Sequence, residues 1–356
     1  MKLLKRLYET YSPSGKENRI RTFIKKHIAA NIPDAVVTKD AVGNLYITRG
    51  IAEDYPCIVA HLDQVQKVRS KDFRAVETRD LIFGYSPANR RQEGLGADDK
   101  NGIWIALRCL EKYEAIKVAF FVGEEVGCVG SNAADMAFFE DCRFVIEPDR
   151  RGYRDLITQI SWENICSEEF LLDMNIEKFG YIPTEGLMTD VEALRSNGIG
   201  VSCINLSCGY YEPHTDYEFT VKEDLMNCLC FVQHIIENCT KIYTHLFDEN
   251  DTGYHYGYGF GDYNATEDMM FDIMMGHPDY TPEDVWDTFC MNFPELSKGE
   301  FLEMYEERML AYGMDIPTES ALISPKKKTQ PQTRKKNRFA NPLSGFKSKT
   351  KKKIPV

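Results

Sequence analysis

The amino-acid sequence predicts an α/β fold, a three-layer sandwich with a mostly parallel central sheet, followed by a small C-terminal helical extension. Short apolar runs alternate with helical patterns along residues 1–245, which is the rhythm of a parallel sheet covered by helices. Clusters of acidic residues and histidine directly follow several of these runs, at residues 60–63, 96–102 and 121–131. Because open α/β sheets bind ligands at the carboxyl ends of their strands, we expect these clusters to meet at one edge of the sheet.

Apolar periodicity places each element along the chain. A turn at residues 12–15 separates two helices within residues 1–31, and the second helix has a continuous apolar face. Alternating apolar and charged residues predict an exposed hairpin at 67–93. Further helices are expected at residues 101–113, 131–140, 190–197 and 222–238, and strands at 36–37, 45–47, 56–60, 117–122, 144–146 and 201–206.

The character of the sequence divides the chain into three parts. Residues 1–245 contain all the acidic clusters and are predicted to be the catalytic domain. Residues 246–323 predict an appended region with a loop rich in Gly, Tyr and Asp, and residues 324–356 predict a basic, disordered tail. Within the appended region, short helices are expected at residues 266–275, 281–291 and 298–312.

Charge and composition narrow the classes of partner and compartment. From residue 325 the tail carries twelve Lys or Arg and no acid, which gives it a charge of +12. Since the whole chain has a net charge of −12, the rest of the chain carries −24. Such a tail is often simply solvated, but nucleic acid or another acidic partner would bind through it. Eleven cysteines without a C-x-x-C pair predict free thiols in a reducing, cytoplasmic compartment. We expect no signal peptide and no membrane span, and the oligomeric state is left open.

Five side chains form a candidate metal centre, since each follows an apolar run or begins a helix. Close carboxylates repel one another unless a cation holds them together. Imidazole and carboxylate ligands suit zinc, with cobalt or manganese as alternatives, and the number of acids balances two divalent ions. The candidate ligands are His61, Asp98, Glu125, Asp149 and His214.

Three further acids are candidates for supporting roles. Asp63 lies two residues after His61, where a carboxylate can hold the second imidazole nitrogen. Glu124 precedes Glu125 and diverges from it in a turn, so it is the candidate general base. Asp190 either caps the helix that follows it or has a substrate-binding or supporting role in the site.

The combination of these motifs resembles the co-catalytic dinuclear zinc exopeptidases, which include peptidase T, the deblocking aminopeptidases and the single-domain leucyl-type aminopeptidases. The similar pattern is H-x-D, G-A-D-D-K-x-G, G-E-E-x-G-x-x-G-S, an acid after a strand and a late histidine. It covers roughly residues 1–240, and only the combination is specific. The gaps at 62–97 and 150–213 are too short for the extra domain of the larger relatives, which implies a compact version.

The resemblance implies a role for each candidate residue. It places one ion on His61, Asp98 and Asp149, and a second ion on Asp98, Glu125 and His214, with Asp98 bridging. It makes Glu124 the base and Asp63 the residue that orients His61. Some relatives have a ligand Glu directly before Pro, so Glu147 is the alternative to Asp149.

The predicted function is therefore a metal-dependent exopeptidase, an aminopeptidase that hydrolyses N-terminal peptide bonds with a water molecule held between two divalent ions. One alternative is an amidohydrolase or deacylase of N-acyl amino acids. Another is a metal-binding scaffold that has lost catalysis. Residues 150–187 and the hairpin at 67–93 are expected to form the walls of the substrate pocket.

Overall fold

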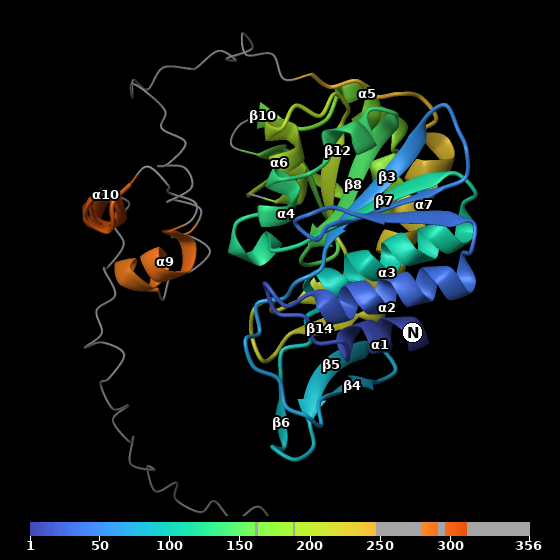
Figure 1. Cartoon of the computed structure of the whole chain (residues 1–356). Helices are drawn as coiled ribbons and strands as arrows, with labels where there is room; N and C mark the ends of the chain where they lie inside the picture. Colours follow the sequence, from blue (N-terminus) through green and yellow to red (C-terminus); the bar gives the residue numbers. More distant parts are fainter. Residues whose placement is uncertain (161–162, 188, 247–272, 274–279, 291–295, 312–356) are drawn as a thin grey trace, which may run out of the picture. The chain divides into compact units, whose positions relative to one another are not determined.

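The computed structural model describes residues 1–160, 163–187, 189–246, 273, 280–290 and 296–311 (Figure 1). The expected loop after residue 246, the basic tail and all but one residue of the expected helix at 266–275 lie outside these residues. In the C-terminal region, α9 (Pro282–Phe289) and α10 (Lys298–Ala311) match the two other expected helices. Thr281 begins α9 with a capping box, and a separate apolar core that includes Val285, Phe301 and Tyr305 joins the two helices.

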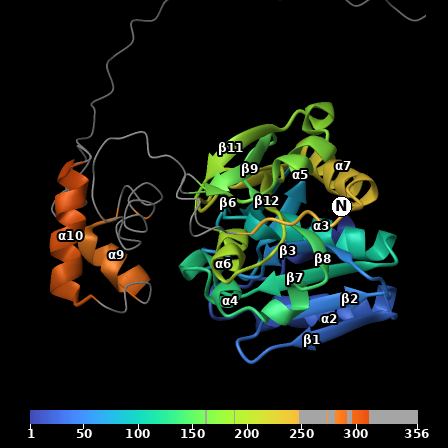
Figure 2. The ribbon, with the colours of Figure 1, turned by 90° about the horizontal axis from the view of Figure 1, so that it is seen from above.

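The described residues up to 246 form a nine-stranded sheet that is parallel at its centre, as expected. Its strand order is β1-β2-β7-β3-β8-β12-β9-β10, and β11 also pairs with β9 (Figure 2). The strands are β1 (Ala35–Lys39), β2 (Leu45–Arg49), β3 (Tyr55–His61), β7 (Ile116–Phe121), β8 (Cys142–Arg150), β9 (Asp155–Ile160), β10 (Glu163–Asn164), β11 (Ile182–Gly186) and β12 (Cys203–Ser207).

Helices cover both faces of this sheet, so the predicted three-layer sandwich is confirmed (Figures 1 and 2). Alternate side chains of β3 face opposite layers: Ile58 and Ala60 join one apolar core, and Cys57 and Val59 join the other. The first core includes α1 (Lys2–Tyr8), α2 (Asn18–Asn31), α3 (Ala97–Lys112), α5 (Glu168–Asp173) and α7 (Lys222–Asn238); the second includes η2 (Met136–Phe139) and α6 (Asp190–Ser196).

The exposed hairpin that the sequence predicts at 67–93 is present, as β4 and β5. It belongs to a second, smaller sheet, because the late strand β14 pairs with β5. Tyr8 of α1 connects α3 with the second sheet, since its hydroxyl is hydrogen-bonded to the side chains of Asn101 in α3 and Thr220 in β14. The strands are β4 (Arg74–Glu77), β5 (Leu81–Ser86), β6 (Arg91–Gln92), β13 (Tyr210–Tyr211) and β14 (Phe219–Val221).

The predicted helix at 131–140 is wrong. The chain instead forms the short α4 (Val129–Asn132) and then the 3-10 turn η2. The backbone nitrogen of Asp135 donates to the hydroxyl of Tyr46, and Asp135 itself is extended, so a continuous helix cannot pass through it. The sequence also did not predict β9, β10, β11, α5 and the 3-10 turn η3 (Ile176–Phe179).

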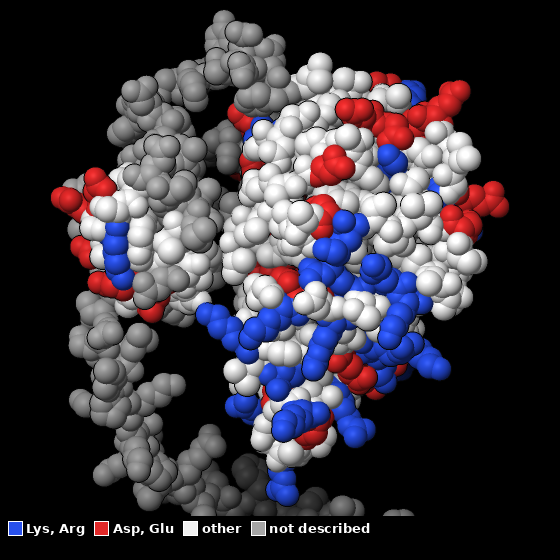
Figure 3. Space-filling model, in the orientation of Figure 1, with Lys and Arg blue, Asp and Glu red and all other residues white. Residues whose placement is uncertain are grey.

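The surface charge is unevenly distributed. Lys and Arg gather over α1, α2 and the β4–β6 hairpin, although the net charge of the whole chain is −12 (Figure 3). Exposed basic residues of α2 include Arg19, Lys25 and Lys26. Among the described residues, no helix is long and apolar enough to cross a membrane.

Candidate metal centre

The carboxyl ends of three adjacent parallel strands bring the predicted residues together. His61 is the last residue of β3, and Asp149 is the last but one of β8. Glu124 and Glu125 begin the 3-10 turn η1 (Glu124–Val126), three residues after the end of β7. These strands lie in the order β7-β3-β8, so their ends are neighbours.

Two groups of three side chains meet at Asp98, the second residue of α3. The first group is His61, Asp98 and Asp149, and the second is Asp98, Glu125 and His214. In each group, one ligand-type atom per residue lies within 4.8 Å of the others. The two carboxylate oxygens of Asp98 face opposite histidines. Its Oδ1 is 2.9 Å from Nε2 of His61, and its Oδ2 is 3.3 Å from Nε2 of His214.

The remaining distances complete both groups. Nε2 of His61 is 3.6 Å from Oδ2 of Asp149, and Nε2 of His214 is 3.1 Å from Oε2 of Glu125. His214 comes from the loop between β13 and β14, where its φ is +64°. The structure thus gathers all five predicted ligand side chains, which lie between residues 61 and 214.

The electrostatics of the cluster fit divalent cations. Burial and neighbouring carboxylates raise the pKa of Glu125 and that of Asp149 above the usual range. The positive charge around these two carboxylates is therefore too small to stabilise both of them as anions. Oε1 of Glu125 is buried without a hydrogen-bond partner among the described residues. Donor atoms of this kind, mixed imidazole and carboxylate, suit zinc in particular.

The histidines already show the effect of the acids around them. Burial lowers the pKa of His214, but Glu125 and Asp98 outweigh it and raise the value to about 11. Burial by itself would raise the pKa of Asp98, yet His214 and His61 hold it well below its usual range. The negative potential that attracts a proton to these imidazoles would also attract a metal cation.

Asp63 lies behind His61, as the sequence suggests. Its Oδ1 is 3.3 Å from Nδ1 of His61, on the far side of the ring from Asp98. The same carboxylate accepts hydrogen bonds from the hydroxyl of Ser14 at 2.7 Å and from the backbone nitrogen of Glu124 at 3.1 Å. Asp63 is therefore fixed by three partners and can hold the orientation of the imidazole.

Glu124 lies beside the first group. Its Oε2 is 3.8 Å from Nε2 of His61, and its side chain is 16% exposed. Glu125, the next residue, is directed to the other group, where it contacts His214. Neighbouring glutamates thus diverge, which is the arrangement that the sequence suggests for a base and a ligand.

Glu147 and Asp149 occupy different environments. The carboxylate of Glu147 accepts hydrogen bonds from the hydroxyl of Thr189 and from the backbone nitrogens of Asp190 and Val191, at the N-terminus of α6. Burial raises the pKa of Glu147 to about 8. Of the two alternatives, Asp149 is the one whose carboxylate lies with His61 and Asp98.

Asp190 is not the cap of its helix. Thr189 is the N-cap residue, and the buried carboxylate of Asp190 accepts a hydrogen bond from the hydroxyl of Ser131. Burial raises the pKa of Asp190 to about 7. The side chain is fully buried, as is that of His61, and its hydrogen bond to Ser131 links α6 to α4.

Glu218, which the resemblance to the deblocking aminopeptidases includes after His214, supports the site through the backbone at the start of α3. It is buried next to β14, and its carboxylate accepts hydrogen bonds from the backbone nitrogens of Gly96, Ala97 and Asp98. The sequence favours core packing over a place in the site for Tyr210. Tyr210 is buried, and its hydroxyl is 3.5 Å from Oδ1 of Asp149. Both contacts depend on the second sheet, since Tyr210 lies in β13 and Glu218 directly precedes β14.

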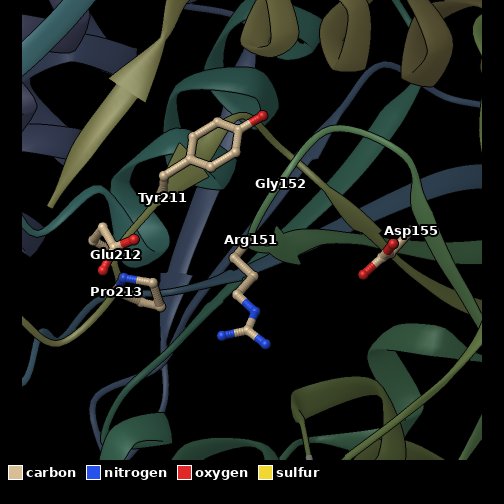
Figure 4. Close-up of a pocket in the computed structure, with 6 residues that line it drawn as sticks. All are labelled: Arg151, Gly152, Asp155, Tyr211, Glu212 and Pro213. Carbon is tan, nitrogen blue, oxygen red and sulfur yellow. The ribbon is translucent and has the colours of Figure 1, made fainter.

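An open pocket of about 400 Å³ is lined by residues that follow Asp149 and precede His214 in the sequence (Figure 4). One wall begins two residues after Asp149, and the other ends directly before His214. The first wall lies within the expected range 150–187, but the β4–β5 hairpin does not line this pocket. The lining residues are Arg151, Gly152, Asp155, Tyr211, Glu212 and Pro213.

No family profile and no curated protein matches this sequence. Similar solved structures include aminopeptidase PepT from Bacillus cereus ATCC 10987, with a TM-score of 0.54, 16% identity, and coverage of 67% of this chain and 98% of that chain. A tripeptidase from Staphylococcus aureus subsp. aureus Mu50 has a TM-score of 0.52 and 14% identity, with coverage of 66% of this chain and 96% of that chain. An aminopeptidase from the archaeon Desulfurococcus kamchatkensis has a TM-score of 0.51 and 16% identity, with coverage of 66% of this chain and 94% of that chain. The resemblance inferred from the motifs is thus confirmed for the fold, which is that of these aminopeptidases.

Proposed function

We propose that this chain is a metal-dependent exopeptidase, an aminopeptidase that removes N-terminal residues from peptides. The observation that carries the proposal is the position of Asp98, whose two oxygens face two separate groups of ligand-type side chains. A single structural ion would need only one such group. The likeness of the fold to that of aminopeptidases supports the same conclusion.

The five ligand-type side chains would hold two divalent ions, most suitably zinc. His61 and Asp149 would hold one ion, Glu125 and His214 the other, and Asp98 would contact both. The chemistry expected of two such ions is activation of a water molecule between them and polarisation of the scissile carbonyl.

The protein's own residues supply the proton transfer and the orientation. The carboxylate of Glu124, beside His61, would accept the proton of the attacking water and pass it to the leaving amine. Asp63 would hold the His61 ring so that Nε2 faces Asp98. Asp190 and Glu218 would fix the elements that carry these groups.

The deciding experiment combines elemental analysis with hydrolysis of a mixed set of short peptides. The wild-type protein is expected to bind two ions. His214→Ala and Asp149→Asn should each bind one ion, and Asp98→Asn should bind no ion. His245→Ala is the matched control, because this half-buried histidine belongs to neither group and its Nε2 is 2.6 Å from the carbonyl oxygen of Asn164. One ion in the wild-type protein, or two in Asp98→Asn, would contradict the bridging role.

The substrates that are cleaved separate the alternatives. Release of free N-terminal amino acids would support the aminopeptidase, whereas cleavage of N-acylated substrates alone would indicate the deacylase. Two bound ions without hydrolysis of either class would indicate a scaffold. We also propose a cytoplasmic location, since all eleven cysteines are free in the structure.

A polyanion such as nucleic acid remains a proposed partner of the basic tail. The Lys and Arg residues over α1, α2 and β4–β6 offer a second basic surface that favours the same class of partner (Figure 3). Deletion of residues 324–356 is expected to weaken retention of the protein on nucleic acid without changing peptide hydrolysis. Equal retention of the full and shortened chains at every salt concentration would contradict this proposal.

A further inference from the structure

Lys and Arg gather on a basic surface that α1, α2 and residues 67–93 form together (Figure 3). Residues 1–31 and 67–93 contain fifteen Lys or Arg and six Asp or Glu, a net charge of +9 in a chain whose net charge is −12. The charge of the basic surface is therefore opposite to that of the chain as a whole. Its exposed cations include Arg19, Lys25, Lys26, Lys67, Lys71 and Arg74.

Contacts between distant segments join the parts of the basic surface. Nζ of Lys5 in α1 is 3.8 Å from Oε2 of Glu77 in β4. The guanidinium of Arg6, also in α1, lies over the ring of Phe23 in α2, 4.9 Å from its centroid. Since α1 contacts both α2 and β4, the cations of the three elements belong to one continuous surface (Figures 1 and 3).

The acids of the basic surface have partners of their own. Oε1 of Glu77 is 3.0 Å from Nζ of Lys222, and Asp72 accepts a hydrogen bond from the hydroxyl of Ser86 at 2.9 Å. Glu93 is buried. Among the described residues, no carboxylate lies within ion-pair distance of the six exposed cations. Their charge is therefore available to an anionic partner.

A membrane is not the partner that this surface fits. A helix that binds a bilayer keeps an exposed apolar face that it inserts among the lipids. In α2 the apolar face, which consists of Ile20, Ile24 and Ile28, is buried in the core. Val68 is the only exposed large apolar side chain in residues 1–31 and 67–93, all of which the structure describes. The basic surface therefore offers charge without an apolar face.

Single-stranded nucleic acid fits the surface less well than a duplex. Proteins that bind single strands stack the bases on aromatic side chains. Here the ring of Phe23 is covered by Arg6, and the ring of Phe73 is covered by Arg69, whose guanidinium is 3.9 Å from the ring centroid. A duplex presents its phosphates on the outside and needs no such stacking.

We propose that the basic surface binds the phosphate backbone of a double-stranded nucleic acid. This inference goes beyond the proposed peptide hydrolysis, and it concerns the folded surface and not the C-terminal tail. Arg19 and Lys26 are seven residues apart in α2, so two helical turns place them on the same face, roughly 10 Å from each other. Phosphates of one strand recur about every 3.4 Å along a duplex, so both side chains can meet the same strand. Contacts to phosphates alone carry no sequence preference.

The test measures binding of the full-length protein to a fluorescent DNA duplex by anisotropy, at a series of salt concentrations. Lys25→Ala/Lys26→Ala removes two exposed cations from α2 and introduces a good helix former. We expect duplex binding to weaken roughly 10-fold at low salt, and the slope of log K against log salt to become less steep by about 1.8. Lys67→Ala/Lys71→Ala, on a different element, should cause a similar change. Wild-type affinity and slope in both double variants would overturn the inference.

A matched control separates this surface from the overall charge of the protein. Lys178→Ala/Lys241→Ala also removes two exposed lysines, but these lie outside the basic surface, in η3 and after α7. This control should keep the wild-type affinity and slope. A loss as large as that of Lys25→Ala/Lys26→Ala would mean that binding follows net charge alone, which would contradict a defined surface. Circular dichroism checks that each variant is folded.

Two further probes test the class of partner. Single-stranded DNA of the same sequence and vesicles of phosphatidylserine and phosphatidylcholine are compared with the duplex at the same salt concentration. The duplex should bind most tightly, and its binding should be the one that depends most on Lys25 and Lys26. Tighter binding of the single strand, or binding to vesicles alone, would overturn the inference. The metal centre and the tail are unchanged in these variants, so failure of the proposed peptide hydrolysis or of the tail's role would leave this result as it stands.

Discussion

The carboxylate of Glu218 accepts a hydrogen bond from the backbone nitrogen of Asp98 at 3.1 Å, while the side chain of Asp98 lies between His61 and His214. The same carboxylate also accepts hydrogen bonds from the nitrogens of Gly96 and Ala97. Glu218 therefore fixes the backbone of the residue that both groups share. The geometry of the centre depends on this contact as much as on the ligand-type side chains.

Replacing Glu218 with Gln should weaken ion binding. The amide nitrogen of Gln would face backbone N–H groups that now donate to a carboxylate, so at least one donor would lose its acceptor. We expect a roughly 10- to 100-fold loss of zinc affinity, as for other residues that orient ligands. Calorimetric titration with zinc measures the loss, and Glu223→Gln, at an exposed position nearby, is the control. Wild-type affinity in Glu218→Gln would remove this role.

Asp63→Asn should also weaken ion binding, but through His61. The variant has no negative charge to hold Nδ1 of the imidazole, so the ring would be less well oriented and less basic. We expect a roughly 10- to 100-fold loss of zinc affinity. Ser14→Ala removes only one hydrogen bond to Asp63 and should have a smaller effect in the same titration. Losses of equal size would show that Asp63 does not act mainly on His61.

The two adjacent glutamates should respond differently to the same substitution. Glu124→Gln is expected to keep two ions and to lose roughly 10²- to 10⁴-fold in kcat, since the proton acceptor is gone. Glu125→Gln should lose the ion that it shares with His214. Elemental analysis beside peptide hydrolysis distinguishes these outcomes. If Glu124→Gln keeps full activity, the proposed proton transfer is wrong.

Asp190 should make the ion-free protein less stable as the pH rises. Burial raises its pKa to about 7 in the folded protein, so between the unfolded value and pH 7 the folded state binds more protons than the unfolded state. Its contribution to the free energy of unfolding should therefore fall by about 2–3 kcal/mol between pH 5 and pH 8. Asp190→Asn should remove this part of the pH dependence, as measured by urea unfolding in the presence of a chelator. Exposed Asp80→Asn is the control, and parallel pH profiles for wild type and Asp190→Asn would contradict the assignment.

Local sequence patterns were sufficient for the parallel centre of the large sheet and for the proximity of the candidate ligands at its edge. His61, Glu125 and Asp149 each follow an apolar strand, and parallel strands end at one edge, so their proximity could be inferred. The helix at 222–238 was also predicted correctly, because its apolar residues repeat at helical spacing.

Features that depend on distant pairing could not be predicted in this way. Glu218 reaches residues 96–98 only because β14 pairs with β5, and a single sequence does not show that pairing. The pocket joins turns at 151–155 and 211–213 for the same reason. The helix expected at 131–140 failed because a hydrogen bond from Asp135 to Tyr46 outweighs local helix propensity.

The pairing of β14 with β5 also determines when the centre can form during synthesis. The ribosome releases His61, Asp98 and Glu125 long before His214 and Glu218, and the second sheet cannot close until β14 has emerged. A nascent chain shorter than about residue 221 carries the first acids without the group that fixes Asp98. A second ion, if bound by Asp98, Glu125 and His214, would therefore be captured late in folding, after both sheets are complete.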